Sequence, residues 1–303
     1  MKIPPPLKQG DKIGVVAPSR MIRPEEMADA LKDLRAWGFE PVLGKSLYAV
    51  DRQFAGTDAA RAADFQAMLD DPGIRAVFCA RGGYGALRIV DAIEFKALKR
   101  DPKWIIGFSD ATTFTMAAYN AGVASIHGPM GISWNGATGD AQSRQYLGDV
   151  LLGKRPVFSA APESPELSRP GLAKGRIIGG NLSMLSQLIG TPTDFDTKGC
   201  ILFLEDLDEY LYHIDRMIVH LKRSGKFDRL AGLVIGGFTD MHDNSTPFGK
   251  TAHEIIAEAA AGHDYPICFG FPVGHSPRNF PILHGVEASL RVSHNLIELE
   301  FHD

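Results

Sequence analysis

The chain has 303 residues, 45% of them hydrophobic and 22% charged, which is the balance of a soluble globular protein of one large domain or two ordinary ones. Its formal net charge of −4 at pH 7 gives no general attraction to nucleic acid or to an anionic membrane, so neither is expected as a partner.

Short apolar strands alternate with amphipathic helices through the first half of the chain. Apolar residues recur at helical spacing in the segments between the strands. The alternation predicts an α/β fold with a parallel, doubly wound sheet. In chain order we expect a strand at 12–17, a helix at 24–37, a strand at 39–43, a helix at 59–69, a strand at 75–80, a helix at 86–93, a strand at 104–108, a helix at 110–121, a strand at 123–127 and a helix at 139–152.

The pattern changes at residues 153–176, which are rich in proline, serine and glycine and show no sustained period. We interpret this stretch as a linker between an N-terminal domain, residues 1–152, and a smaller C-terminal α/β or α+β domain, residues 177–303. In the second domain we expect strands at 201–204, 233–237, 286–292 and 296–301, and helices at 209–224 and 250–261.

Ser109 stands between the strand at 104–108 and the helix after it, with Gly107 two residues earlier. A serine on such a sharp turn has its hydroxyl lifted out of the sheet, as in a nucleophile elbow. The sequence departs from Gly-x-Ser-x-Gly because Ala111 replaces the second glycine. Two interpretations stay open: Ser109 is a nucleophile, or Ser109 or Asp110 caps the helix.

A serine nucleophile needs a base, and two histidines are candidates. His275 lies in a loop dense in glycine and proline, and such loops place side chains at domain rims. His127 ends the strand at 123–127, in the same domain as Ser109. The local sequence leaves both open, together with a solvated surface role for His275.

An acid that orients the base is expected at the carboxyl end of a strand, where open α/β sheets bind ligands. Glu205 follows the apolar run at 200–204 and shares a strand face with Phe203. It is a candidate for this acid, or else an exposed strand-end carboxylate. Asp206 and Asp208 are interpreted as cap and first-turn acids of the next helix.

Gly82 and Gly83 follow the strand at 75–80 and are candidates for an oxyanion hole, because glycine lets backbone N–H groups approach a ligand closely. The N–H of Asp110, directly after Ser109, is the second candidate donor. A glycine-rich loop can instead hold a phosphate. However, Gly-Gly-Tyr-Gly has neither the Gly-x-Gly-x-x-Gly spacing nor a P-loop lysine.

No metal or cofactor is expected. Cys79, Cys200 and Cys268 are odd in number, widely spaced and set in apolar runs, which argues against disulfides and zinc binding. The N-terminal segment lacks the apolar core of a signal peptide, and no run reaches the ~20 apolar residues that span a bilayer. We therefore expect a cytoplasmic protein.

Eight short motifs occur in a specific order along the chain: Gly-Asp-Lys-Ile-Gly-Val-Val-Ala-Pro-Ser (10–19), Ala-Arg-Gly-Gly-Tyr-Gly (80–85), Ile-Gly-Phe-Ser-Asp (106–110), His-Gly-Pro-Met (127–130), Gly-Gly-Asn-Leu-Ser-Met-Leu (179–185), Leu-Phe-Leu-Glu-Asp (202–206), Tyr-His-Ile-Asp-Arg-Met (212–217) and Gly-His-Ser-Pro-Arg-Asn (274–279). With them the chain resembles, over nearly its whole length, the LD-carboxypeptidase family of serine peptidases. That family includes the muramoyltetrapeptide carboxypeptidases and the microcin-immunity peptidases.

The resemblance implies that Ser109 is the nucleophile, His275 the general base and Glu205 the residue that orients it. It demotes His127 to a structural role. It also implies an N-terminal domain similar to a class I glutamine amidotransferase, a distinct C-terminal domain and a homodimer. One departure concerns Leu283, which stands where the family more often has proline and leaves the shape of the His275 loop open.

The implied activity is that of a serine LD-carboxypeptidase of cell-wall recycling, which needs no cofactor. It releases the terminal D-Ala of a murein tetrapeptide, L-Ala-γ-D-Glu-meso-diaminopimelate (or L-Lys)-D-Ala. The oxyanion would bind around Gly82, Gly83 and Asp110, and Arg81 would bind the terminal carboxylate or else anchor its loop. Alternatives are a microcin-immunity-type peptidase that cleaves an acyl-sulfamoyl-nucleotide peptide, a general esterase or amidase, and a non-catalytic binding protein.

Overall fold

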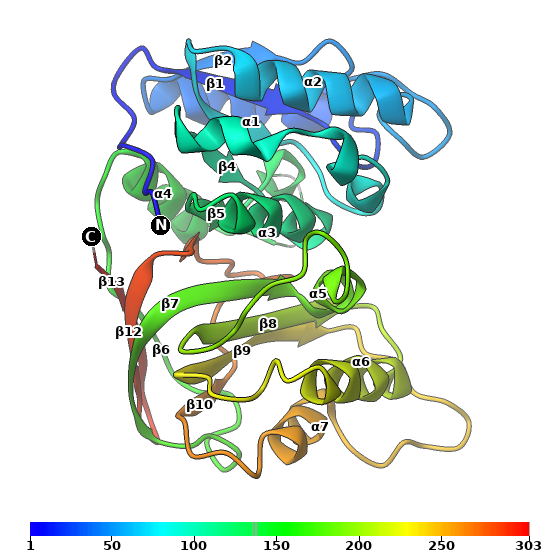
Figure 1. Ribbon diagram of the computed structural model, residues 1–303, viewed down its shortest axis with the longest axis vertical. Helices are drawn as coiled ribbons and strands as arrows, with labels where there is room; N and C mark the ends of the chain where they lie inside the picture. Colours follow the sequence, from blue (N-terminus) through cyan, green and yellow to red (C-terminus); the bar gives the residue numbers. More distant parts are fainter. Residues whose placement is uncertain (135, 137, 303) are drawn as a thin grey trace. The chain divides into compact units, whose positions relative to one another are not determined.

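The computed structural model describes residues 1–134, 136 and 138–302 (Figure 1). The chain forms two compact units. Unit 1 comprises Met1–Arg155 and Pro277–Gly285, and unit 2 comprises Pro156–Ser276 and Val286–Asp303. The chain therefore returns to unit 1 for one short segment, which begins two residues after His275.

Unit 1 is built on a six-stranded sheet in the order β11-β5-β4-β3-β1-β2. The first five strands of the chain pair in parallel, whereas β11 runs antiparallel to β5. Strands β1, β3, β4 and β5 are almost wholly buried, as expected where helices cover both faces of a sheet. The bounds are β1 (Lys12–Val16), β2 (Glu40–Leu43), β3 (Ile74–Cys79), β4 (Trp104–Ile106), β5 (Ser125–His127) and β11 (Ile282–His284).

Aromatic residues pack on both faces of this sheet. On one face Phe65 and Phe114 lie with ring centroids 4.6 Å apart in a core that includes Val77. Trp134 contacts Phe78 edge to face at 6.1 Å, and Phe78 points to the opposite face because it alternates with Val77 along β3. The doubly wound α/β fold is therefore confirmed. The helices are α1 (Pro24–Ala36), α2 (Asp58–Asp70), α3 (Thr112–Asn120) and α4 (Ala141–Leu151).

Unit 2 contains a seven-stranded mixed sheet in the order β10-β9-β8-β7-β12-β13-β6. Strands β7 to β10 pair in parallel, and β12, β13 and β6 extend the sheet in antiparallel pairing. Helix α5 packs on β7 and β8, α6 packs on α5 and α7, and α7 packs on β9. The bounds are β6 (Phe158–Ala160), β7 (Gly171–Asn181), α5 (Leu182–Leu188), β8 (Ile201–Leu207), α6 (Leu211–Arg223), β9 (Gly232–Thr239), α7 (Ala252–Ala259), β10 (Ile267–Phe269), β12 (Glu287–Val292) and β13 (Ile297–Phe301).

Some elements differ from those predicted. Residues 86–93 form two 3-10 turns, Ala86–Arg88 and Val90–Ala92, instead of a helix. The N–H of Ala86 donates to a side chain far along the chain, so a tertiary contact overrides local helix propensity there. Residues 153–176, where a linker is predicted, contain β6 and the first part of β7. Strand β11 is three residues long, too short to show an alternating pattern in the sequence.

Candidate active site

Ser109 lies in a strained turn that directly follows β4. Its φ is +61°, in the left-handed region that non-glycine residues rarely adopt and that costs about 1–3 kcal/mol. A Cβ on Gly107 would lie 2.8 Å from Ala111 Cβ, so the tight turn requires glycine at this position. Ser109 begins a 3-10 turn, Ser109–Ala111, that leads into α3. The backbone thus has the form of a nucleophile elbow.

Neither Ser109 nor Asp110 caps a helix. The N-cap residues of the 3-10 turn and of α3 are Phe108 and Ala111, and neither makes a capping hydrogen bond through its side chain. The cap interpretation of these two polar residues is therefore wrong. The Ser109 side chain is half-buried.

The Gly82–Gly83 loop packs directly against Ser109. A Cβ built on Gly82 would lie 3.0 Å from Ser109 Cβ and 3.2 Å from Ser109 Oγ. Gly83 has φ of +102°, which disfavours any other residue. The backbone of this loop therefore lies close to the serine hydroxyl, with little room for a side chain at position 82.

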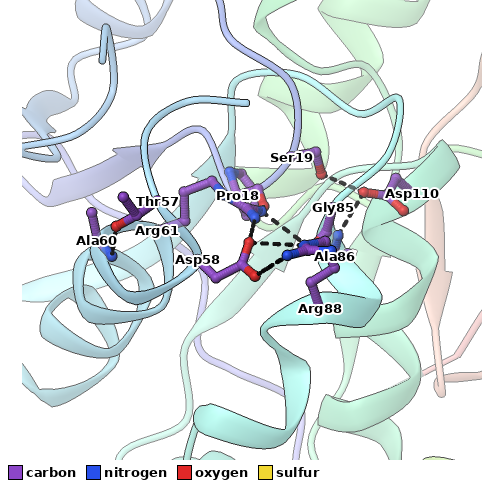
Figure 2. A network of polar contacts seen from close by, with 10 residues as sticks. All are labelled: Pro18, Ser19, Thr57, Asp58, Ala60, Arg61, Gly85, Ala86, Arg88 and Asp110. Atoms are coloured by element: carbon purple, nitrogen blue, oxygen red, sulfur yellow. Dashed lines mark hydrogen bonds and ion pairs between the residues drawn. The ribbon is translucent and has the colours of Figure 1, made fainter. Parts of the chain in front are cut away.

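The carboxylate of Asp110 fixes the loops around Ser109 (Figure 2). Its Oδ2 accepts hydrogen bonds from Ser19 Oγ at 2.5 Å and from the backbone N–H of Ala86 at 2.8 Å. The side chain is buried, and this burial raises the pKa of the Asp110 carboxyl, although both hydrogen bonds and the charge of Arg61 oppose the shift. Asp110 thus connects the loop after β1, the loop after β3 and the turn after β4.

The buried guanidinium of Arg61 supports the same loops from α2 (Figure 2). It donates to the carbonyl oxygens of Pro18 and of Gly85, the latter at 3.1 Å, and pairs with Asp58. Asp58 also binds the exposed Arg88 through Nη2 at 2.6 Å. Sequence inspection missed this network, because its members are spread over residues 18–110 and no local motif links them.

Arg81 is bound by other residues of unit 1. Its Nη1 donates to the carbonyl oxygen of Met21 at 3.2 Å and lies 3.8 Å from Glu26 Oε1. Both side chains are partly exposed. The contacts are those of a residue that anchors a loop, the second of the two roles considered for Arg81.

In unit 2, Glu205 and His275 form a close pair. His275 Nδ1 lies 2.6 Å from Glu205 Oε2, and the backbone N–H of His275 donates to the same oxygen at 3.2 Å. Glu205 lies near the carboxyl end of β8 and is completely buried, whereas His275 lies in the loop after β10. Glu205 is therefore not an exposed strand-end carboxylate, nor is His275 a solvated surface residue.

The pKa of His275 is raised above its ordinary value. Burial of the ring opposes the charged form and lowers the pKa, but the charge and hydrogen bond of Glu205 and the charge of Asp206 outweigh it. Since the Glu205 contact is made by Nδ1, it favours the tautomer in which Nδ1 carries hydrogen and Nε2 is the unprotonated, basic nitrogen. This is the arrangement that a general base requires.

Asp206 serves a different purpose from the helix cap predicted for it. Strand β8 continues through Leu207, so Asp206 is still a strand residue. Its carboxylate accepts hydrogen bonds from Asn181 Nδ2 at 2.8 Å and from the N–H and hydroxyl of Ser183 at 2.9 and 2.8 Å. Burial and the charge of Glu205 raise its pKa to about 6. Asp206 therefore binds the first turn of α5.

His127 is completely buried in β5, where its ring lies edge to face with Phe108 at 5.8 Å. Ile282 of β11 pairs with it in the sheet. His127 is thus a core residue of unit 1.

Across residues 1–134, 136 and 138–302, no three His, Cys, Asp or Glu side chains form a metal-binding group, and no helix is long and apolar enough to span a membrane.

Comparison with models of known protein families shows to which family the chain belongs. Residues 13–128 match the LD-carboxypeptidase N-terminal domain, and residues 174–290 match the LD-carboxypeptidase C-terminal domain. The chain belongs to the LD-carboxypeptidase family. A Bacillus subtilis relative named "Probable murein peptide carboxypeptidase" is 32% identical over 98% of this chain and 94% of its own. A murein tetrapeptide carboxypeptidase of Pseudomonas aeruginosa is 29% identical over 92% of each chain.

Solved structures agree with this assignment of the LD-carboxypeptidase fold. The muramoyltetrapeptide carboxypeptidase of Oxalobacter formigenes is similar with a TM-score of 0.87 and 26% identity, over 96% of this chain and 99% of that one. MccF, solved in complex with glutamyl sulfamoyl guanosine, is similar with a TM-score of 0.85 over 97% of each chain. At 23% identity the second likeness concerns the fold alone.

Proposed function

We propose that this member of the LD-carboxypeptidase family is a serine carboxypeptidase that releases C-terminal D-Ala from a murein tetrapeptide. The observation that carries the proposal is the 2.6 Å contact between His275 Nδ1 and the buried Glu205 carboxylate. A base oriented in this way is of use to a nucleophile, and the strained turn at Ser109 is built to present one. The names of the Bacillus and Pseudomonas relatives support the substrate class.

The proposed reaction has two steps. Ser109 Oγ attacks the carbonyl carbon of the residue before D-Ala while His275 Nε2 takes its proton. The oxyanion is stabilised by backbone N–H groups of Gly83 and Asp110, and a single donor of this kind contributes about 3–4 kcal/mol. The C–N bond then breaks, and His275 returns the proton to the amine of D-Ala.

Water completes the cycle. His275 takes a proton from the water as its oxygen attacks the Ser109 ester, and the tripeptide leaves as the serine regains its proton. Glu205 remains ionised throughout and holds the imidazole tautomer. The proposal requires no metal ion or organic cofactor. It makes the enzyme a cytoplasmic protein. As the family resemblance implies, the enzyme is a homodimer that acts on peptides recovered from the cell wall.

The test is D-Ala release from purified L-Ala-γ-D-Glu-meso-diaminopimelate-D-Ala, with the wild type and Ser109→Ala measured together. We expect release by the wild type and a loss of at least about 10³-fold in the variant, as for removal of a serine nucleophile elsewhere. Two other substrates separate the alternatives. Rapid turnover of a p-nitrophenyl ester without D-Ala release would identify an esterase, and cleavage of an aminoacyl sulfamoyl adenosine instead would identify a microcin-immunity-type peptidase.

A further inference from the structure

A cationic cavity opens in unit 1 beside the glycine loop. Its volume is about 410 Å³, and it is lined by Arg20, Met21, Arg23, Glu26, Gln53 and Arg81. Three arginines against one glutamate give these side chains a formal charge of +2 (3 − 1). A cavity with this charge favours a small anionic group, and guanidinium groups match the planar, two-oxygen geometry of a carboxylate.

Arg20 connects this cavity with the loop that borders Ser109. The backbone N–H of Arg20 donates to the carbonyl oxygen of Gly82 at 3.4 Å. A Cβ on Gly83 would lie 2.5 Å from Arg20 Cδ and 3.0 Å from Arg20 Nε, so the arginine stem rests on the glycine backbone. Gly82 in turn lies against Ser109 Oγ. Two consecutive loop residues, Gly83 and Gly82, therefore lie between the Arg20 side chain and the serine.

Arg81 differs from the other two arginines because its guanidinium is already engaged. Arg81 is bound to the carbonyl oxygen of Met21 and lies near Glu26. Arg23 precedes α1, and it binds Glu26 Oε2 at 2.7 Å through its backbone N–H, not through its guanidinium. Within residues 1–134, 136 and 138–302, the Arg20 guanidinium makes no hydrogen bond or ion pair. Its donors are therefore available to a ligand.

We propose that Arg20, and not Arg81, binds the C-terminal carboxylate of the substrate. The inference rests on the proposed function, because that reaction fixes where a carboxylate must lie. In a C-terminal peptide the carboxylate carbon is three bonds, at most about 4 Å, from the carbonyl carbon that the serine attacks. The Arg20 side chain rests on the loop that packs against Ser109, and it is therefore the arginine of this cavity that we assign to the carboxylate. Gly83 is then required for a second reason, since any side chain there would displace Arg20.

The test compares two ligands that differ only in that carboxylate: the murein tetrapeptide and its C-terminal amide. Binding is measured by calorimetry in the full-length Ser109→Ala protein, so that neither ligand is consumed. Arg20→Met keeps the stem and removes the charge. Arg23→Met removes the same charge from the same cavity wall and is the matched control.

We expect the Ser109→Ala protein to bind the free acid more tightly than the amide. Arg20→Met should weaken binding of the acid about 10- to 100-fold, the range for a lost hydrogen bond to a charged group, and leave the amide unchanged. Arg23→Met should weaken the acid at most about fivefold, as for an exposed charge. Arg20→Lys should restore part of the preference, because lysine supplies charge without the two-donor fork.

Three results would overturn the assignment: no preference for the acid, equal weakening of both ligands by Arg20→Met, or no detectable binding of either ligand. The proposed function is tested separately, by measuring D-Ala release from the protein that retains Ser109. Release without an acid preference would reject the Arg20 site and keep the peptidase. A preference that depends on Arg20, without release, would keep the site and reject the peptidase.

Discussion

Glu205 Oε2 binds His275 twice, through the ring Nδ1 at 2.6 Å and through the backbone N–H at 3.2 Å. The double contact fixes both the ring and the loop that carries it. It depends on Gly274, because a Cβ at that position would lie 2.4 Å from the same Glu205 oxygen. The carboxylate therefore lies against a bare backbone, which explains why glycine precedes the histidine.

The raised pKa of His275 sets the pH dependence of activity. A general base acts in its neutral form, so kcat/KM should rise with pH through a limb above about 6.5, the ordinary value for histidine. Glu205→Gln removes the charge that raises the pKa, so the residual activity should rise through a limb at lower pH. Profiles of kcat/KM for both proteins check this. If kcat/KM rises over the same pH range in the wild type and in Glu205→Gln, Glu205 does not set the pKa of His275.

The same shift affects stability, with a defined sign. A histidine whose pKa is raised in the folded state stabilises the fold fully below its unfolded pKa of about 6.5 and loses that contribution as pH rises through the folded value. The difference in unfolding free energy between wild type and His275→Ala should therefore shrink from pH 5 to pH 8. A difference that grows with pH would contradict the pairing.

Gly274→Ala should disrupt the pair by two separable effects, a collision with Glu205 and a φ of +97°. Gly190→Ala is the matched control, because Gly190 has φ of +79° and no heavy atom within 4 Å of the added Cβ. The control should lose about 1 kcal/mol of stability and retain activity. Gly274→Ala should lose more stability and most D-Ala release. Equal effects of the two substitutions would show that the collision is relieved at no cost.

Asp110→Ala should loosen the loops around Ser109. The substitution leaves the buried Ala86 N–H and the Ser19 hydroxyl without their acceptor, at about 1–3 kcal/mol each. Asp110→Asn keeps one carbonyl oxygen as acceptor and should retain most of the stability. Urea unfolding and kcat measured for both variants test the role. Identical losses would mean that the charge, not the acceptor geometry, matters.

Arg61→Met should destabilise unit 1, because the Pro18 and Gly85 carbonyl oxygens lose a buried donor. The expected cost is about 2–5 kcal/mol, larger than that of Arg88→Met, which removes an exposed partner of the same Asp58. Thermal unfolding of the two variants provides the comparison. Similar melting temperatures would argue against a structural role for the Arg61 network.

Local sequence predicted the parallel strands of unit 1, β8 and β9 of unit 2 and the turn at Ser109, because buried strands and glycine-bounded turns leave short-range patterns. It left His127 as a rival to His275, and the resemblance to a family was needed to prefer His275. The structure adds the contact with Glu205, across 70 residues of sequence. The catalytic role of these residues remains a prediction.

Other features could not be predicted because they depend on distant contacts. Asp206 binds the first turn of α5, 23 residues earlier, although an acid at the end of an apolar run looks like a helix cap. Strand β11 is defined only by its pairing with β5. The hydrogen bonds that Asp110 accepts from Ser19 and Ala86 span 91 and 24 residues of sequence. In each case the partner, not the local sequence, determines the role of the residue.

The most direct test of the central claim is labelling with a serine-reactive fluorophosphonate, followed by mapping of the modified residue by mass spectrometry. The account predicts that Ser109 is labelled, that the murein tetrapeptide slows the labelling, and that His275→Ala reduces its rate by at least about 10²-fold, the lower bound of general-base catalysis. Labelling of another residue, or an unchanged rate in His275→Ala, would contradict it.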